Sequence, residues 1–235
     1  MSENILSVSR KELKYKINFM QYVKLSYVLS SALTSDKNNG VDGYTVRSLY
    51  FDTYNNMDFY DKLNGVENRK KIRLRLYRYD SDKVKLEIKK KYGDNQQKKT
   101  VWIDRLDAEE LIKCNYEVLK KYKSNIANTI YNIMKIDSMK PVVLIEYKRK
   151  AFVHAMNNIR LTLDSQIHAS ETNFDFFAKN PIMNPVENFY YPLLEVKFNG
   201  FIHKWIADLI KIHSLNKQSF SKYVESRKIF HQYMA

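Results

Sequence analysis

The chain has 235 residues, and its 40 lysines and arginines outnumber its 26 aspartates and glutamates, giving a formal net charge of +14. Apolar residue types make up 44% and aromatics 14%, enough to build a core for one domain spanning residues 1–235, so a wholly disordered protein is excluded. Five glycines and a single cysteine, Cys114, leave no glycine-rich phosphate loop, no disulfide framework and no cysteine-based zinc site.

The same composition narrows the compartment and the partners. The chain does not start with a basic region followed by an apolar stretch, and it has no apolar run of about 18 residues. With one cysteine, we expect a cytoplasmic protein without a membrane span. A surplus of fourteen positive charges repels itself unless an anionic partner binds it. That partner is nucleic acid, an anionic membrane surface or another polyanion.

Alternation and turn residues predict strands along the chain, and helical periodicity predicts helices between them. In chain order these are a strand at 10–17, a helix at about 19–34, a strand at 44–53, an irregular or short helical connection at 55–68, strands at 71–79, 83–91 and 97–103, helices at about 107–123 and 125–136, strands at 142–151, 158–164 and 191–198, and helices at about 201–213 and 219–234. Asp107 and Glu110 have the spacing of a capping box. The segment 165–190 contains Pro181 and Pro185 and no clear period, so we expect a long surface connection there.

Several predicted strands carry charges along one face and apolar side chains along the other. Arg73 and Arg75 share one side of their strand. The other charged or polar faces consist of Lys85, Glu87 and Lys89; Arg160, Thr162 and Asp164; and Glu195 and Lys197. Such strands fit an open sheet whose charged face is in solvent and whose apolar face is covered by helices.

They also fit an α+β fold in which eight antiparallel strands close into a β-barrel, with helices packed outside and charges lining the lumen. A barrel of eight strands holds little more than side chains or one slim ligand. Cations lining such a lumen are costly unless a polyanion fills it. Arginine forks and lysine ammonium groups suit phosphate oxygens, and the few carboxylates could hold a divalent cation such as Mg²⁺ or Mn²⁺.

Eight short motifs that combine charged residues with apolar or aromatic ones follow one another along the chain. They are Arg10-Lys11-Glu12-Leu13-Lys14-Tyr15, Ser48-Leu49-Tyr50-Phe51-Asp52-Thr53, Arg73-Leu74-Arg75, Leu86-Glu87-Ile88-Lys89, Tyr147-Lys148-Arg149, Arg160-Leu161-Thr162-Leu163-Asp164, Leu194-Glu195-Val196-Lys197 and Ser221-Lys222-Tyr223. As an ordered set they resemble the polyphosphate polymerase (VTC, vacuolar transporter chaperone) domain family of the triphosphate tunnel metalloenzyme, or CYTH-like, superfamily. The resemblance covers nearly the whole chain.

The resemblance implies an eight-stranded tunnel and an ATP-dependent polyphosphate polymerase, which transfers the γ-phosphate of ATP to a growing inorganic polyphosphate chain. It implies Mn²⁺ or Mg²⁺ as cofactor, with Glu195 as the metal ligand. The residues expected to act on the reacting phosphates are Arg73, Arg75, Lys89, Arg149, Arg160 and Lys222. Further phosphate contacts are expected from Lys14, Lys98 (in preference to Lys99), Lys197, Ser221 and Tyr223.

The same resemblance names ATP and polyphosphate as partners. A closed tunnel admits a bare phosphate chain but not a duplex, so we expect no nucleic-acid partner. Any membrane attachment would come from a partner chain, and the oligomeric state is left open.

One departure from the superfamily pattern bears on the reaction. Members that hydrolyse triphosphates typically open with Glu-x-Glu-x-Lys, whereas this chain has Arg10, Glu12 and Lys14 at those positions. The exchange removes one metal-binding carboxylate and favours the polymerase. Two other functions stay open: a tunnel-fold triphosphatase acting on inorganic triphosphate or a nucleoside triphosphate, and a non-catalytic polyphosphate-binding module. Glu87 is either a second metal ligand or a salt-bridge partner, and Asp164 is expected to orient Arg160 or a neighbouring lysine.

Overall fold

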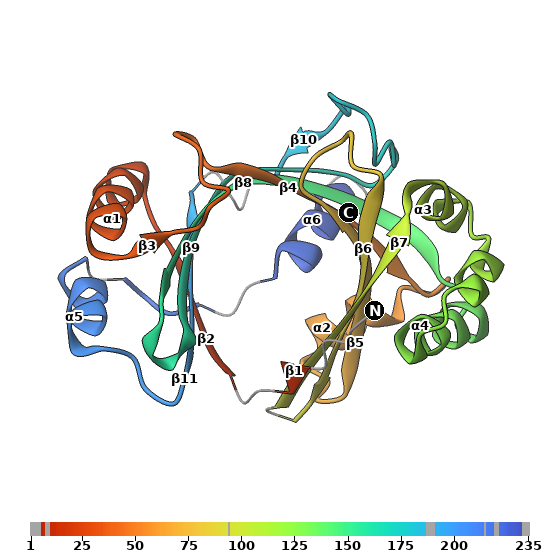
Figure 1. The fold of residues 1–235 in the computed structure, drawn as a ribbon, viewed down its shortest axis with the longest axis horizontal. Coiled ribbons are helices and arrows are strands. Elements are labelled where there is room, and N and C mark those ends of the chain that lie inside the picture. The colour runs from red at the N-terminus through yellow and green to blue at the C-terminus, as the bar shows by residue number, and fades with distance from the viewer. Residues whose placement is uncertain are drawn as a thin grey trace.

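The computed structural model describes residues 6–7, 10–93, 95–186, 191–213, 215–218 and 221–231. Its central feature is a strongly curled antiparallel sheet that forms a trough (Figure 1). Helices cover the convex surface on both sides, and one helix lies within the curve.

Eight long strands build the sheet. They are β2 (Arg10–Lys16), β4 (Tyr44–Asp52), β5 (Arg69–Leu76), β6 (Lys83–Tyr92), β7 (Asn95–Asp104), β8 (Lys140–His154), β9 (Ile159–Ser170) and β11 (Leu193–Asn199). Three two-residue strands, β1 (Leu6–Ser7), β3 (Thr34–Ser35) and β10 (Asn184–Pro185), join it within the described part of the chain. All eight predicted strands are therefore confirmed.

The strand order is β1-β7-β6-β5-β4-β8-β9-β11-β2, with antiparallel pairing throughout. The expected closed barrel is not formed: among the described residues no backbone pairing joins β2 to β7, and the sheet remains an open half-barrel (Figure 1). Both edges are occupied by other segments. The short β1 pairs with β7 at Gln97 and Lys98. On β2, the amide of Gln218 donates to the carbonyl of Lys14 (2.9 Å).

Two hydrophobic clusters hold helices against the convex face. On one side, Ile72, Leu74 and Leu86 belong to a cluster with residues of the helices on that side. Those helices are α3 (Arg105–Ile112), the 3₁₀ segment η1 (Tyr116–Lys121) and α4 (Asn125–Ile136). On the other side, β2, β9 and β11 pack against α1 (Phe19–Ala32) and α5 (Lys204–Ile212). Because the apolar side chains of each strand face these helices, their charged neighbours face the trough.

A third cluster lies on the concave side and positions α6 (Lys222–His231). Tyr223 and Val224 of this helix pack with Tyr50 of β4 and Val143 of β8. Helix α2 (Met57–Leu63) contributes Phe59 to the same cluster, and α6 lies within the curve of the sheet (Figure 1). This apolar plug fills part of the trough and leaves the remainder polar.

The region predicted as one helix at 107–123 is divided. Helix α3 begins at Arg105 and ends at Ile112, and Cys114 then takes a left-handed backbone conformation (φ 66°), which no helix tolerates. The predicted capping box is wrong, because the N-cap position belongs to Asp104. Asp107, within α3, instead accepts a hydrogen bond from the hydroxyl of Tyr122, which follows η1.

The expected surface connection at 165–190 is only partly right. Strand β9 continues to Ser170, and β10 pairs with it. The following segment is held down by the buried Arg47 guanidinium, which donates to the carbonyls of Phe176 (2.9 Å) and Ala178 (2.5 Å). Residues 187–190 lie outside the described part. One more 3₁₀ turn, η2 (Met156–Asn158), joins β8 to β9, and none of the described helices is both long and apolar enough to cross a membrane.

Candidate functional site

Two adjoining cavities lie along the concave face of the trough. The inner cavity, of about 160 Å³, is lined by side chains from β2, β4 to β8, β11 and the start of α6. The outer cavity, of about 450 Å³, lies beside it, between β2, β5, β6 and the segment 215–218. The residues that line both are Glu12, Lys14, Lys71, Lys89 and Ser221.

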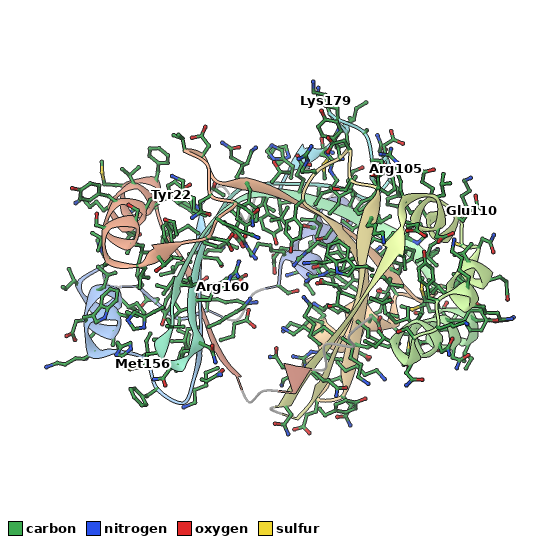
Figure 2. All side chains as sticks on the ribbon, viewed as in Figure 1. Tyr22, Arg105, Glu110, Met156, Arg160 and Lys179 are labelled. Atoms are coloured by element: carbon green, nitrogen blue, oxygen red, sulfur yellow. The ribbon has the colours of Figure 1, made fainter. Side chains whose placement is uncertain are left out.

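Strand register explains why the cations of β5 and β6 meet there. Arg73 lies opposite Glu87, and Lys71 lies opposite Lys89, with each pair on the concave face. Their apolar neighbours are buried under the helices. Arg160 from β9 also lies on the concave side of the sheet (Figure 2).

Glu87 is the first of three carboxylate centres in the inner cavity. It is 2% exposed, accepts a hydrogen bond from Arg73 Nε (2.7 Å), and forms an ion pair with Lys98. Burial opposes its ionisation, but Arg73 and Arg75 outweigh this and hold the pKa of Glu87 far below its usual range. The carboxylate therefore fixes the two arginine side chains before any ligand binds.

Asp164 and Glu195 form the second centre. Arg149 makes a two-pronged contact with Asp164 (2.6 and 2.7 Å), and Lys222 Nζ lies 2.6 Å from Asp164 and 2.8 Å from Glu195. Burial disfavours ionisation of both acids, yet the neighbouring cations lower the pKa of each. For Lys222, burial is outweighed by these two carboxylates, which raise its pKa. Arg149 and Lys222 are thus held charged and oriented.

Glu12 is the third centre and lies where the two cavities adjoin. Lys14, Lys89 and Lys197 surround it at 3.5 to 3.7 Å. Burial opposes its ionisation, but Lys197, Lys14 and Lys89 together lower the pKa of Glu12 to about 2. One carboxylate here faces three ammonium groups, so the junction keeps a positive surplus.

Four lysines of the cavities show the effect of that surplus. Burial, reinforced by neighbouring cations, lowers the pKa of Lys62 and Lys89 and lowers that of Lys71 well below its usual value. Burial and the nearby Arg73 lower the pKa of Lys98 to about 8, even though Glu87 opposes the shift. A ligand that brought negative charge into these cavities would oppose all four shifts.

Most of the predicted phosphate-binding residues therefore surround one inner cavity. It is lined by Lys14, Arg73, Arg75, Lys89, Lys98, Arg149, Glu195, Lys197, Ser221, Lys222 and Tyr223. Arg160 lies apart from them, bonded to Asp36 (3.1 Å) and to the Tyr44 hydroxyl (3.3 Å). Tyr223 borders the inner cavity with its ring and not its hydroxyl, because the hydroxyl donates a hydrogen bond to the buried Asp52. The side chain of Arg10 lies outside the described residues.

The sequence reasoning missed several lining residues. Lys71 is two positions before Arg73 and four before Arg75, so the same alternation could have placed it on the charged face. Its ammonium group lies 2.9 Å from the Ser221 hydroxyl and 4.8 Å from the Tyr223 ring centre. Tyr50 and Tyr147, whose hydroxyls meet Arg73 and Arg75, had no separate signal because tyrosines are common in strands. Of the two partners predicted for Asp164, the structure shows a neighbouring lysine, Lys222, together with Arg149, and not Arg160.

The carboxylates suit a divalent cation only when phosphate is present. Among the described residues, no three His, Cys, Asp or Glu side chains gather into a metal-binding group. Glu195 is 6% exposed and borders the inner cavity, with Glu12 close enough to influence its charge. Mg²⁺ is commonly held by one or two carboxylates together with substrate phosphates. The residues fit a cation of that kind, and Glu195 is the carboxylate that they offer to it.

A family profile described as the VTC domain matches residues 9–231. The chain belongs to the VTC domain family. A search of curated protein sequences gave no match.

Solved structures share the fold of this VTC domain. A candidate adenylate cyclase from Bacillus halodurans superposes with a TM-score of 0.55 at 13% identity, over 94% of this chain and 96% of that one. A candidate adenylyl cyclase from Hippeastrum, described as having a dominant triphosphatase activity, superposes with a TM-score of 0.54 at 15% identity, over 93% and 94%. At these identities the similarity shows a common tunnel fold and does not by itself assign an activity.

Proposed function

We propose that this VTC domain is a polyphosphate polymerase that transfers the γ-phosphoryl group of ATP to the end of an inorganic polyphosphate chain. Membership of the family supports this. The observation that carries the proposal is the pair of adjoining cationic cavities, because a polymerase must hold a donor triphosphate and an acceptor chain together. A triphosphatase needs only water as its second substrate and has no use for the outer cavity of about 450 Å³.

The geometry supports a mechanism in which the protein positions phosphates and neutralises their charge. Phosphoryl transfer spreads negative charge over the transferring group, and preorganised cations stabilise it at little reorganisation cost. Glu87 holds Arg73, and Asp164 holds Arg149 and Lys222, in fixed positions around the inner cavity. These cations are the ones we place around the reacting phosphates.

In the reaction, a terminal oxygen of the acceptor chain attacks the γ-phosphorus and forms a new P–O–P link. The bond between the γ-phosphorus and the β–γ bridging oxygen breaks, and its electron pair leaves with ADP. The attacking phosphate oxygen is already ionised at neutral pH, so no protein general base is required. A bound Mn²⁺ or Mg²⁺ would withdraw charge from the phosphates, and Glu195, with Glu12 nearby, would hold it.

The test is incubation of the purified chain with γ-labelled ATP and Mn²⁺ or Mg²⁺, followed by gel separation of the products. We expect a ladder of phosphate chains together with ADP, and loss of the ladder in Glu195→Gln. Arg73→Ala should lower the rate at least tenfold, since a charge-assisted hydrogen bond contributes roughly 1.5–3 kcal/mol.

The rival functions give different products in the same assay. Free phosphate without a ladder would identify a triphosphatase, the activity described for the Hippeastrum protein. Tight polyphosphate binding with no turnover would identify a binding module. Glu109 on α3 is partly exposed and forms an ion pair with Arg105, away from both cavities, so Glu109→Gln serves as the matched acid-to-amide control and should leave the ladder unchanged.

A further inference from the structure

Beyond Arg75, the concave face changes from phosphate-binding to aromatic character. Strand register places Arg75 opposite Lys85, and Lys85 opposite Trp102, in one row across β5, β6 and β7. The Lys85 ammonium lies 4.9 Å from the Trp102 ring centre and 5.0 Å from that of Tyr77. Trp102 is 47% exposed and Tyr77 is 38% exposed, so much of both rings is open to solvent.

The aromatic character continues to the opposite wall of the trough. The Tyr44 and Tyr77 ring centres are 6.0 Å apart, and the Tyr44 hydroxyl accepts a hydrogen bond from Arg160 (3.3 Å). We call this end of the trough the aromatic mouth. It consists of Tyr44, Tyr77, Lys85, Trp102 and Arg160.

The outer cavity at the other end has a different lining. Among the described residues, no aromatic side chain borders it. Its lining residues besides those shared with the inner cavity are Lys62, Arg69, Lys70, Lys91, Gln96, Lys217 and Gln218. The lining of the trough therefore changes along its length. Aromatic rings lie at one end, arginines in the middle and lysines at the other end.

A nucleoside triphosphate has two different ends in the same way, because it carries an aromatic base at one end and phosphates at the other. Polyphosphate consists of phosphate throughout and gains nothing from a ring. Stacking of a base on an aromatic side chain is favourable and tolerates any base, since every base has a π-face. Rings adjoining a phosphate cavity thus match the nucleoside part of a donor whose phosphates lie among the arginines.

We propose that the aromatic mouth is a nucleoside subsite in which Trp102 and Tyr77 stack the donor's base and Lys85 meets its α-phosphate. This rests on the proposed function in so far as the donor is a nucleotide. The direction of the reaction follows: the nucleotide enters at the aromatic mouth, and the phosphate chain occupies the outer cavity. Arg160 lies at this mouth, apart from the inner cavity, and would contact the nucleoside side of the donor.

Binding measurements with two ligands of equal phosphate content test the subsite without requiring turnover. Calorimetric titration would compare ATP with inorganic tripolyphosphate on the wild-type chain and on Trp102→Ala. We expect ATP affinity to fall about tenfold or more in the variant, with tripolyphosphate affinity changed less than twofold. Trp102→Phe, which keeps a ring, should restore most of the ATP affinity. Trp205→Ala, on the outer helix α5 and 38% exposed, is the matched control.

A spectroscopic readout separates stacking from a structural role. The chain has two tryptophans, so Trp205→Phe leaves Trp102 as the sole indole. ATP should quench its fluorescence, and tripolyphosphate should not. Equal loss of ATP and tripolyphosphate affinity in Trp102→Ala, or no quenching by ATP, would overturn the subsite. If ATP binding depends on Trp102 but no phosphate ladder forms, the subsite stands and the polymerase proposal fails.

Discussion

Lys71 is a partly buried cation that lowers the stability of the folded protein and adds positive charge to the site. Its ammonium group lies where the inner and outer cavities adjoin, and it donates a hydrogen bond to the Ser221 hydroxyl. Burial and the cations Lys14 and Lys62 lower its pKa well below the usual value. A cation in such surroundings weakens the folded state, and a bound polyanion is what would compensate for it.

Lys71→Met should therefore move stability and binding in opposite directions. Methionine fills a similar volume without charge, so we expect a gain of about 1 kcal/mol, or roughly 2–4 °C in Tm for a chain of this size. Affinity for tripolyphosphate should fall at least tenfold. Thermal melts and calorimetric titrations measure the two effects. Lys90→Met, which alternation places on the opposite face of β6, should alter neither; a destabilised Lys71→Met protein with normal affinity would contradict the argument.

Glu87→Gln should have the reverse effect on stability. Glu87 is the shared partner of Arg73 and Lys98, and Arg75 lies 3.9 Å away. Its loss leaves these cations without compensation, which should cost about 3–5 kcal/mol of unfolding free energy. Because a phosphate chain supplies negative charge to the same cations, saturating tripolyphosphate should recover much of the loss. Urea unfolding with and without the ligand would show this, and equal destabilisation in both conditions would mean that phosphate does not reach Glu87.

At the scale of elements, α6 connects the site to the concave core. Ser221 and Lys222, at its start, border the inner cavity, while Tyr223 and Val224 are buried against β4 and β8. Arg227, 7% exposed, fixes the helix from its other side. It donates to Asn56 (2.9 Å) and to the carbonyl of Val142 (3.3 Å).

Arg227→Met should lower both stability and phosphate transfer. It removes two hydrogen bonds from a buried setting, which should cost about 1–3 kcal/mol. The helix would then hold Lys222 less rigidly, and we expect a rate reduction of at least fivefold at a temperature where both proteins are fully folded. Lys228→Met alters the neighbouring residue, whose ion pair with Glu225 is partly exposed, and should leave the rate within twofold. A normal rate in Arg227→Met would show that α6 does not need this anchor.

The strands were readable from the sequence because each alternates between a helix-covered face and the trough. That pattern is local, and it placed Arg73, Arg75, Glu87, Glu195 and Lys197 on the correct side. The position of α6 and the failure of the sheet to close into a barrel could not be predicted, because they depend on contacts between distant segments. Lys71 and Ser221, for example, are 150 residues apart and meet only in the fold. The helix predicted at 107–123 is interrupted at Cys114, whose left-handed backbone conformation could not be predicted from its side chain.

On the scale of the whole molecule, the +14 net charge has a structural explanation. Much of it is collected on one concave surface, where three carboxylate centres leave the cations in excess. The surplus appears as lowered pKa values at Lys62, Lys71, Lys89 and Lys98. A polyanion in the trough favours the charged form of each lysine, so binding and proton uptake are coupled.

Polyphosphate binding should accordingly take up protons near pH 8, where the pKa of Lys98 lies in the free protein. The bound phosphates raise that pKa, so lysines that are partly neutral before binding become charged. The affinity for polyphosphate should then fall as pH rises above about 8, because binding requires protons whose concentration in solution decreases. Calorimetric titration of tripolyphosphate at pH 8, in buffers of different ionisation enthalpy, measures the uptake directly. Lys98→Met should reduce the uptake, whereas no net uptake at pH 8 would mean that the lysines are fully charged beforehand and that the crowding of cations in the trough does not govern their protonation.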